Sequence, residues 1–172
     1  MTRDTLGVGD RFSLTMGRGR DIADGLPLVG EVFVELRGPD GEVKDVRRTP
    51  NLVVDAGEVH IADQLSTTPG GAAMSHMAVG TGATAPAFGN TALGAEVDRN
   101  ALTSRTDSGN VVTYVGTWAA GDATNSALTE AGIFNAGAAG TMLARATFTA
   151  IDKQAGDTLT ITWTVTIGTS GA

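Results

Sequence analysis

The chain has 172 residues, with 12 Lys and Arg, 19 Asp and Glu, no Cys and a formal net charge of −7 at pH 7. The length predicts one domain, with or without an arm, and the lack of Cys excludes disulfides, thiol nucleophiles and Cys-based metal sites. The acidic charge argues against a nucleic-acid-binding surface, and no apolar run is long enough to cross a bilayer or to form a signal-peptide core. We therefore expect a soluble protein, and composition alone permits an acidic cytosolic globule without indicating anything more specific.

Residues 1–30 contain four Arg, four Asp and six Gly. The apolar residues between them follow neither a helical nor a strand period. This composition predicts an extended arm that is either mobile or ordered only against a partner chain. The residues that we expect to bind such a partner are the four arginines, Arg3, Arg11, Arg18 and Arg20.

Strand patterning begins at Glu31, where Val32, Val34 and Leu36 occupy alternate positions. The sequence GPDG at 38–41 is typical of a tight turn, because Pro fixes φ and Gly accepts a positive φ. We therefore predict a strand from residue 31 and a return strand over 42–48, which ends before Pro50.

A short helix is predicted after residue 54. Asp55 and Glu58 have the spacing of a capping box, in which the two residues exchange side-chain to backbone hydrogen bonds. Val59, Ala62 and Leu65 follow at helical spacing. We expect these three side chains to form an apolar stripe that packs on the sheet.

The rest of the chain is predicted to form short strands separated by loops rich in small residues, with one helical turn at 93–97. The predicted loops cover 66–73 and 80–86. The predicted strands cover 75–79, 111–118, 130–134, 142–151 and 158–167.

Residues 158–167, TLTITWTVTI, place Thr at every even position and a large apolar residue at every odd position. A strand with this period buries its odd-numbered side chains and turns its threonines toward water or another subunit. Trp118 and Trp163 are expected in the core. The pattern as a whole predicts an all-β fold, an antiparallel β-sandwich or jelly-roll-like domain at 31–172 with one short helix, preceded by the arm at 1–30.

The segment GTGATA at 80–85 matches the G-x-G-x-x-A form of the dinucleotide-binding fingerprint. That fingerprint requires a helix whose N-terminus faces the pyrophosphate, but Pro86 and Gly89 follow here. We therefore expect a flexible loop and no bound cofactor.

Other candidate sites are weak. His60 and Asp63 share one side of the predicted helix, but a metal site would need a further ligand, so a surface or capping histidine is favoured. Asp122, Asn125 and Glu130 offer oxygen ligands without EF-hand spacing, which favours a solvated turn over a calcium site. No G-x-S-x-G sequence occurs, and GTSG at 168–171 is the nearest match. A catalytic pair of carboxylates is neither favoured nor excluded. We predict no enzyme, no cofactor and no metal.

Five segments keep a distinctive order and spacing: MAVGTGATAP at 77–86, TALGAEVDR at 91–99, LTEAGIFN at 128–135, GTMLARATF at 140–148 and LTITWTVTIG at 159–168. Together they resemble a family of tailed-bacteriophage virion proteins, whose members are described as tail fibre, minor tail or capsid decoration proteins. The resemblance spans about residues 50–168 and leaves out the arm.

The resemblance implies a non-enzymatic virion structural protein, made in the host cytoplasm. We expect a capsid decoration (cement) protein on the capsid exterior, because the chain has neither a coiled-coil heptad nor a repetitive shaft. A tail fibre or tail-tip module that binds a host receptor or glycan is the alternative, and a hydrolase of cell-wall glycans is a remote third. The expected partners are the major capsid protein, bound by the arm arginines, and copies of the chain in a homotrimer. No nucleic acid, membrane or small-molecule substrate is expected.

Overall fold

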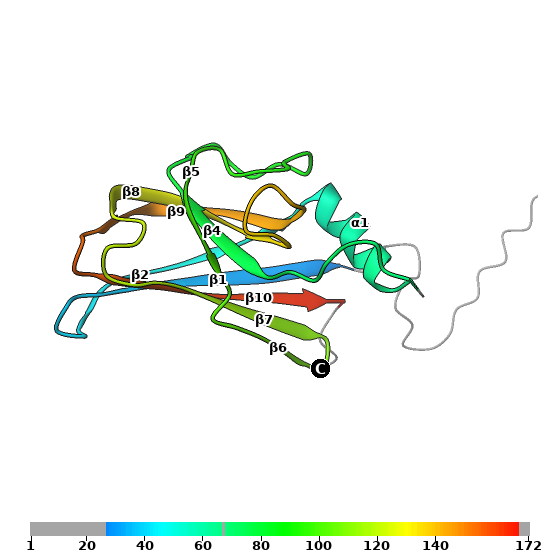
Figure 1. Cartoon of the computed structure of the whole chain (residues 1–172), viewed down its shortest axis with the longest axis horizontal. Coiled ribbons are helices and arrows are strands. Elements are labelled where there is room, and N and C mark those ends of the chain that lie inside the picture. The colour runs from blue at the N-terminus through cyan, green and yellow to red at the C-terminus, as the bar shows by residue number, and fades with distance from the viewer. Residues whose placement is uncertain (1–26, 67, 169–172) are drawn as a thin grey trace, which may run out of the picture.

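The computed structural model describes residues 27–66 and 68–168. These residues form two antiparallel sheets of five strands each, packed face to face, with one short helix at one end of the sandwich (Figure 1). The predicted all-β antiparallel sandwich is therefore confirmed.

The first sheet, called sheet A, has the strand order β2 (Val43–Pro50), β1 (Leu28–Arg37), β10 (Thr158–Ile167), β7 (Val111–Trp118) and β6 (Ser104–Ser108). The second sheet, called sheet B, has the order β3 (Leu52–Val53), β9 (Met142–Lys153), β8 (Asn125–Phe134), β4 (His76–Gly80) and β5 (Glu96–Ala101). The helix α1 (Asp55–Gln64) follows β3 and packs against β9.

The threonine ladder forms strand β10, with the bounds that its alternation predicts. Its side chains from Leu159 to Val165 at odd positions are buried, whereas its threonines are half-buried. Trp163 lies opposite Val32 of β1 and Tyr114 of β7, so the ladder stands at the centre of sheet A. Both tryptophans are fully buried, as predicted.

Several strand limits differ from the prediction. Strand β1 begins at Leu28 rather than at residue 31, because β10 is long enough for its Ile167 to pair with Leu28. The predicted helical turn at 93–97 is wrong, since Glu96 begins strand β5, which pairs with β4. Strand β6 was not predicted, because its five residues, SRTDS, are all exposed and show no apolar alternation.

Helix α1 begins at Asp55, but the predicted capping box is wrong. The N-cap is Val54, which makes no side-chain capping bond, and the Asp55 amide donates instead to the carbonyl of Phe88 at 2.9 Å. No helix of the described residues is long and apolar enough to span a membrane.

The expected apolar stripe of α1 does not lie on the sheet. Val59 is 70 % exposed and Leu65 is 85 % exposed, whereas Gly57 and His60 are the buried residues of the helix. The expectation of a surface histidine is therefore wrong for His60. The reason is Gly57: its backbone lies so close to the carbonyl of Leu143 in β9 that only a residue without a side chain fits there.

Candidate interaction surface

The four predicted partner-binding residues, Arg3, Arg11, Arg18 and Arg20, lie outside the described residues, as does the end of the GTSG segment at 168–171. A candidate surface must therefore be sought on the sandwich. Its two outer faces differ sharply in how they are built.

The outer face of sheet B is covered by the loop of residues 81–95, called the 81–95 loop, which runs above β4 and β8 in Figure 1. Glu130 of β8 lies beneath this loop with no exposed surface. Its Oε1 accepts hydrogen bonds from the amides of Gly82 at 2.8 Å and Ala95 at 2.7 Å, and its Oε2 accepts one from Gly94 at 2.9 Å. Arg145 of β9 donates to Oε2 through Nε at 2.9 Å and Nη2 at 2.7 Å.

These five hydrogen bonds set the charge state of Glu130. Burial by itself would raise the pKa of the carboxyl group, since it removes the charged form from water. The hydrogen bonds from the loop amides and from Arg145 outweigh burial and hold the pKa of Glu130 below its ordinary value. Glu130 is therefore ionised, and its two carboxylate oxygens accept the hydrogen bonds that hold the 81–95 loop on sheet B.

The glycines at 80–85 have a structural explanation. A Cβ on Gly80 would lie 2.7 Å from Glu130 Oε1, and a Cβ on Gly82 would lie 2.4 Å from the same atom. Both positions need glycine because the backbone passes directly over the carboxylate. The segment is indeed a loop, but it is anchored by a buried ion pair instead of being free.

A small second core closes the rest of this face. Leu93 of the loop packs against Phe134 of β8, and the other buried members are Val54, Ala78 and Met142. The guanidinium of Arg99 lies 3.6 Å from the centre of the Phe134 ring. The outer face of sheet B is thus already occupied by the chain's own loop.

The outer face of sheet A has a different composition. Strands β10, β7 and β6 are in register, so their outward positions form one continuous surface of Thr, Ser and Val. We call it the threonine face, and its members are Thr158, Thr160, Thr162, Thr164, Thr166, Val111, Thr113, Val115, Thr117, Ser104, Thr106 and Ser108. None of these side chains is charged, and all are at least partly exposed.

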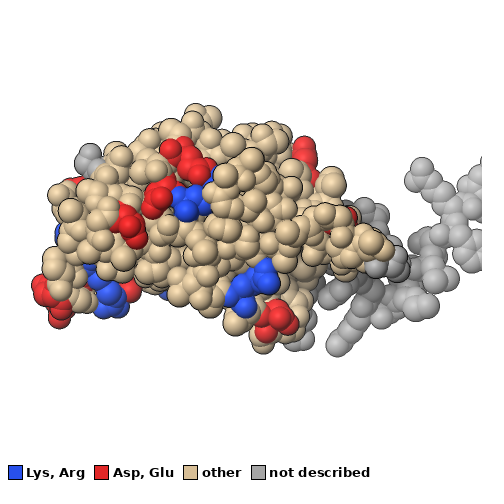
Figure 2. Space-filling model, viewed as in Figure 1, with Lys and Arg blue, Asp and Glu red and all other residues tan. Residues whose placement is uncertain are grey.

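Charged residues gather at one border of the threonine face, on β1 and β2. Arg48 pairs with Glu31 at 2.6 Å and lies 4.7 Å from the centre of the Phe33 ring, and Arg37 pairs with Glu35 at 2.7 Å. Exposed pairs of this kind contribute about 0–1 kcal/mol. Figure 2, drawn from the same side as Figure 1, shows charged side chains in small groups between broad uncharged areas.

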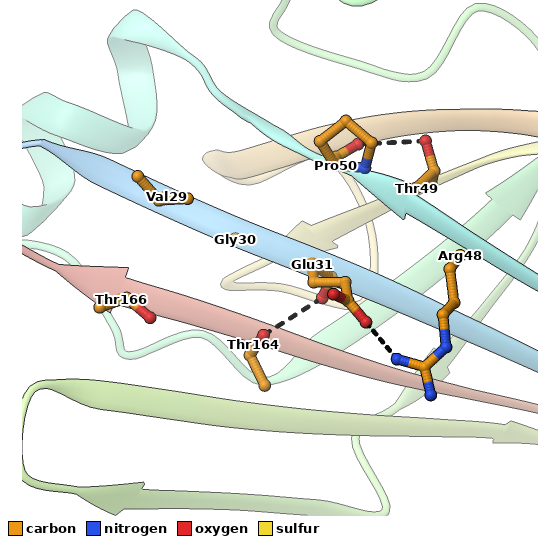
Figure 3. Close-up of a pocket in the computed structure, with 8 residues that line it drawn as sticks. All are labelled: Val29, Gly30, Glu31, Arg48, Thr49, Pro50, Thr164 and Thr166. Atoms are coloured by element: carbon orange, nitrogen blue, oxygen red, sulfur yellow. Dashed lines mark hydrogen bonds and ion pairs between the residues drawn. The ribbon is translucent and has the colours of Figure 1, made fainter. Parts of the chain in front are cut away.

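A recess of about 390 Å³ lies where the threonine face meets this border. Figure 3 shows Thr164 and Thr166 of β10 on one side of it and Arg48 of β2 on the other, with Gly30 between them. Thr164 donates to the Glu31 carbonyl at 3.4 Å, so one hydroxyl and one ion pair frame the recess.

The other candidate residues do not form a metal site in the part of the chain that the structure describes. Among residues 27–66 and 68–168, no group of three or more His, Cys, Asp or Glu side chains could hold a metal ion. Asp63 accepts from the amides of Gly70 and Gly71, both at 2.9 Å, and these bonds lower its pKa. The expected solvated turn is wrong for Glu130, which is buried away from Asp122.

Sequence reasoning missed the Glu130–Arg145 pair, because its members lie 15 residues apart on two strands. The glycines at 80 and 82 were the one sequence feature that could have indicated a close approach of the backbone to a buried group.

No family model, curated protein or solved structure matches the chain.

Proposed function

We propose that this chain is a non-enzymatic structural subunit of a tailed-bacteriophage virion, a capsid decoration (cement) protein. In this role it binds the outside of the shell and stabilises it through repeated contacts with the major capsid protein and with its own copies. The threonine face is the observation that carries the proposal. The resemblance of five segments over about residues 50–168 supports the virion as its setting.

The threonine face is suited to protein contact for a physical reason. Charged residues are depleted at the centres of protein interfaces, because each buried charge must find a partner or pay a desolvation penalty. A surface of hydroxyl and methyl groups avoids that penalty and can face an identical copy as well as a capsid protein. The threonine face adds nothing to the net charge of −7 of the chain, and this net charge disfavours non-specific association of copies.

Repetition then supplies the affinity. A subunit that contacts both the shell and its neighbours gains from the high effective concentration of the second contact, so individually weak contacts add. Closed cyclic symmetry is usual for such assemblies, and we propose a homotrimer.

A lysine in the centre of the threonine face tests the proposal. We expect Thr162→Lys to abolish self-association, measured by analytical ultracentrifugation, and to reduce occupancy on purified particles by about tenfold or more, measured by quantitative mass spectrometry. Thr84→Lys adds the same charge on the exposed 81–95 loop and should leave both quantities unchanged. Equal self-association and occupancy in the two variants would reject the threonine face as the contact surface.

The location on the particle needs a separate experiment. Gold-labelled antibody against the chain should decorate the shell of intact particles in electron micrographs. Labelling confined to the tail would reject capsid decoration.

A tail module that binds a host receptor or glycan is the second candidate, and the recess beside Thr164 favours it. Its hydroxyl groups and the Glu31–Arg48 pair offer donors and acceptors that could bind sugar hydroxyls. Glycan-array binding by the chain that is lost on Glu31→Gln would support this function, and its absence would remove it.

A further inference from the structure

A pocket of about 260 Å³ opens at the end of the sandwich where α1 packs. Eight of its twelve lining residues are aliphatic, among them Ile61 and Leu65 of α1 and Ile167 of β10. Leu65 is 85 % exposed, so the described residues leave this apolar surface open to water. The volume is below the ~300–1,000 Å³ of typical small-molecule sites, which favours peptide side chains as the occupant.

The described part of the chain starts at the edge of this pocket. Strand β1 begins with Leu28, whose register partner is the pocket residue Ile167. The amide of Gly168 donates to the carbonyl of Pro27 at 2.7 Å, which fixes Pro27 at this end of the sandwich. Pro27, the first described residue, therefore lies beside an apolar pocket that residues 27–66 and 68–168 leave unfilled.

The residues just before Pro27 have matching chemistry. Leu26 and Ile22 are apolar and stand one and five positions before Pro27. A chain spans at most ~3.6 Å per residue, so Ile22 lies within about 18 Å of Pro27. Both side chains are thus within reach of the pocket.

Charge complements the apolar match. Arg105 of β6 lines the pocket and donates to the carbonyl of Met74. It belongs to none of the ion pairs formed within residues 27–66 and 68–168. Asp21 and Asp24 flank Ile22 in the sequence and supply the opposite charge.

We propose that residues 21–26 fold back and fill this pocket of their own chain, with Ile22 and Leu26 against its aliphatic side chains and an aspartate beside Arg105. The short tether favours the same chain over a second copy, because it gives the segment an effective concentration of about millimolar. Docking fixes the point from which residues 1–20, with all four arginines, leave the sandwich. The inference does not depend on the proposed function.

Introduced cysteines test it cleanly, because the full chain has none. Ile22→Cys is combined with Ile61→Cys in the pocket or, as the control, with Thr166→Cys on the outer face of sheet A. Thr166 pairs with Val29, two residues after Pro27, so it lies within the same reach of the tether but outside the pocket. Under mild oxidation at high dilution, we expect the intrachain disulfide to form at least about tenfold faster in the Ile61 pair, measured by mass spectrometry of the intact chain.

Equal rates for the two pairs would overturn the proposal. Disulfides formed only between chains, detected by mixing chains of different isotopic mass, would overturn it in favour of a second copy as the occupant.

A second measurement needs no cysteine. Tyr114 lines the pocket and is the only tyrosine, so its ring signals in an NMR spectrum report on the occupant directly. We expect Ile22→Asp to shift these signals and Leu6→Asp, the control, to leave them in place. Unchanged Tyr114 signals in Ile22→Asp would also overturn the proposal.

Discussion

Glu130 illustrates how one buried side chain can organise a long segment. Removal of a carboxylate from water carries an effective penalty of several kcal/mol, which is recovered only when its lone pairs are well bonded. Here three loop amides and the guanidinium of Arg145 supply that bonding. The stability of the Glu130–Arg145 pair therefore depends on both side chains and on the position of the loop amides.

We expect Glu130→Gln to lower the free energy of unfolding by about 3–5 kcal/mol, because it leaves the Arg145 charge buried and uncompensated. Urea denaturation measures the change. Glu35→Gln removes the same charge from an exposed pair with Arg37 and should cost less than about 1 kcal/mol. Similar losses in the two variants would contradict a special role for Glu130.

The protonation of Glu130 also predicts how stability depends on pH. Its pKa is lowered in the folded chain, and so is that of Asp157, mainly by the hydrogen bond from Lys44 at 2.7 Å. A lowered folded-state pKa gives stability that is fully present above the ordinary carboxyl pKa, about 4, and is lost as the pH falls through the folded value. We expect the unfolding free energy to drop in this acidic range, and the drop to be smaller in Glu130→Gln. Identical pH profiles for the two chains would show that another group is responsible.

These residue contacts were beyond sequence reasoning for a specific reason. The meeting of Glu130 and Arg145 depends on the register of β8 and β9, in which Glu130 pairs with Thr147 and Gly132 pairs with Arg145. A sequence shows the two charges but not which strands are neighbours. Proximity in sequence instead suggested a shared turn with Asp122, which the structure does not contain.

Among the elements, β7 and β10 were predicted from end to end, β10 because its strict alternation leaves no other solution and β7 because turn-forming residues bound a β-like segment. Helix α1 was predicted at the right place but with the wrong face inward. Helical spacing identifies an apolar stripe, yet packing is decided by how closely the backbone can approach the sheet. At Gly57 that approach is closest, so the stripe at Val59 and Leu65 turns outward.

Helix α1 therefore offers a test in which intrinsic propensity and packing oppose each other. Alanine is favoured over glycine in a helix by about 1 kcal/mol, but a Cβ on Gly57 would lie 2.1 Å from the carbonyl oxygen of Leu143. We expect Gly57→Ala to lower the unfolding free energy by about 1–3 kcal/mol in urea denaturation. Val59→Ala should change it by less than about 0.5 kcal/mol, and a more stable Gly57→Ala chain would refute the packing argument.

At the scale of the whole molecule, the sandwich has one face closed by its own loop and one face that residues 27–66 and 68–168 leave open. The succession of short strand-like segments and turns predicted the sandwich, and alternation in β10 predicted that a threonine surface would point outward. The covered face could not be predicted, because the 81–95 loop has only two large apolar residues, Phe88 and Leu93, and is held by an ion pair.

The boundary of the folded unit makes a further prediction. A chain that lacks residues 1–26 keeps every pair of β1 with β10, whereas a chain that lacks 1–30 loses the pairs from Leu28 to Gly30. We expect the free energy of unfolding of the chain that lacks 1–30 to be about 2 kcal/mol or more below that of the chain that lacks 1–26, because the longer deletion removes apolar burial and ladder hydrogen bonds. Thermal and urea unfolding of both chains measure the difference, and equal midpoints would place the start of the domain after Gly30.

The manner in which Glu130 holds its loop bears on how this protein can evolve. The carboxylate accepts hydrogen bonds from the main-chain amides of Gly82, Gly94 and Ala95. Because these bonds involve the backbone, they do not depend on which side chains lie between the three residues. The side chains of residues 83–88 take no part in these bonds. Residues 83–88 can therefore change in sequence during evolution while the loop keeps its backbone conformation and the sandwich keeps its fold. The loop is thus a position where related proteins can diversify their surface.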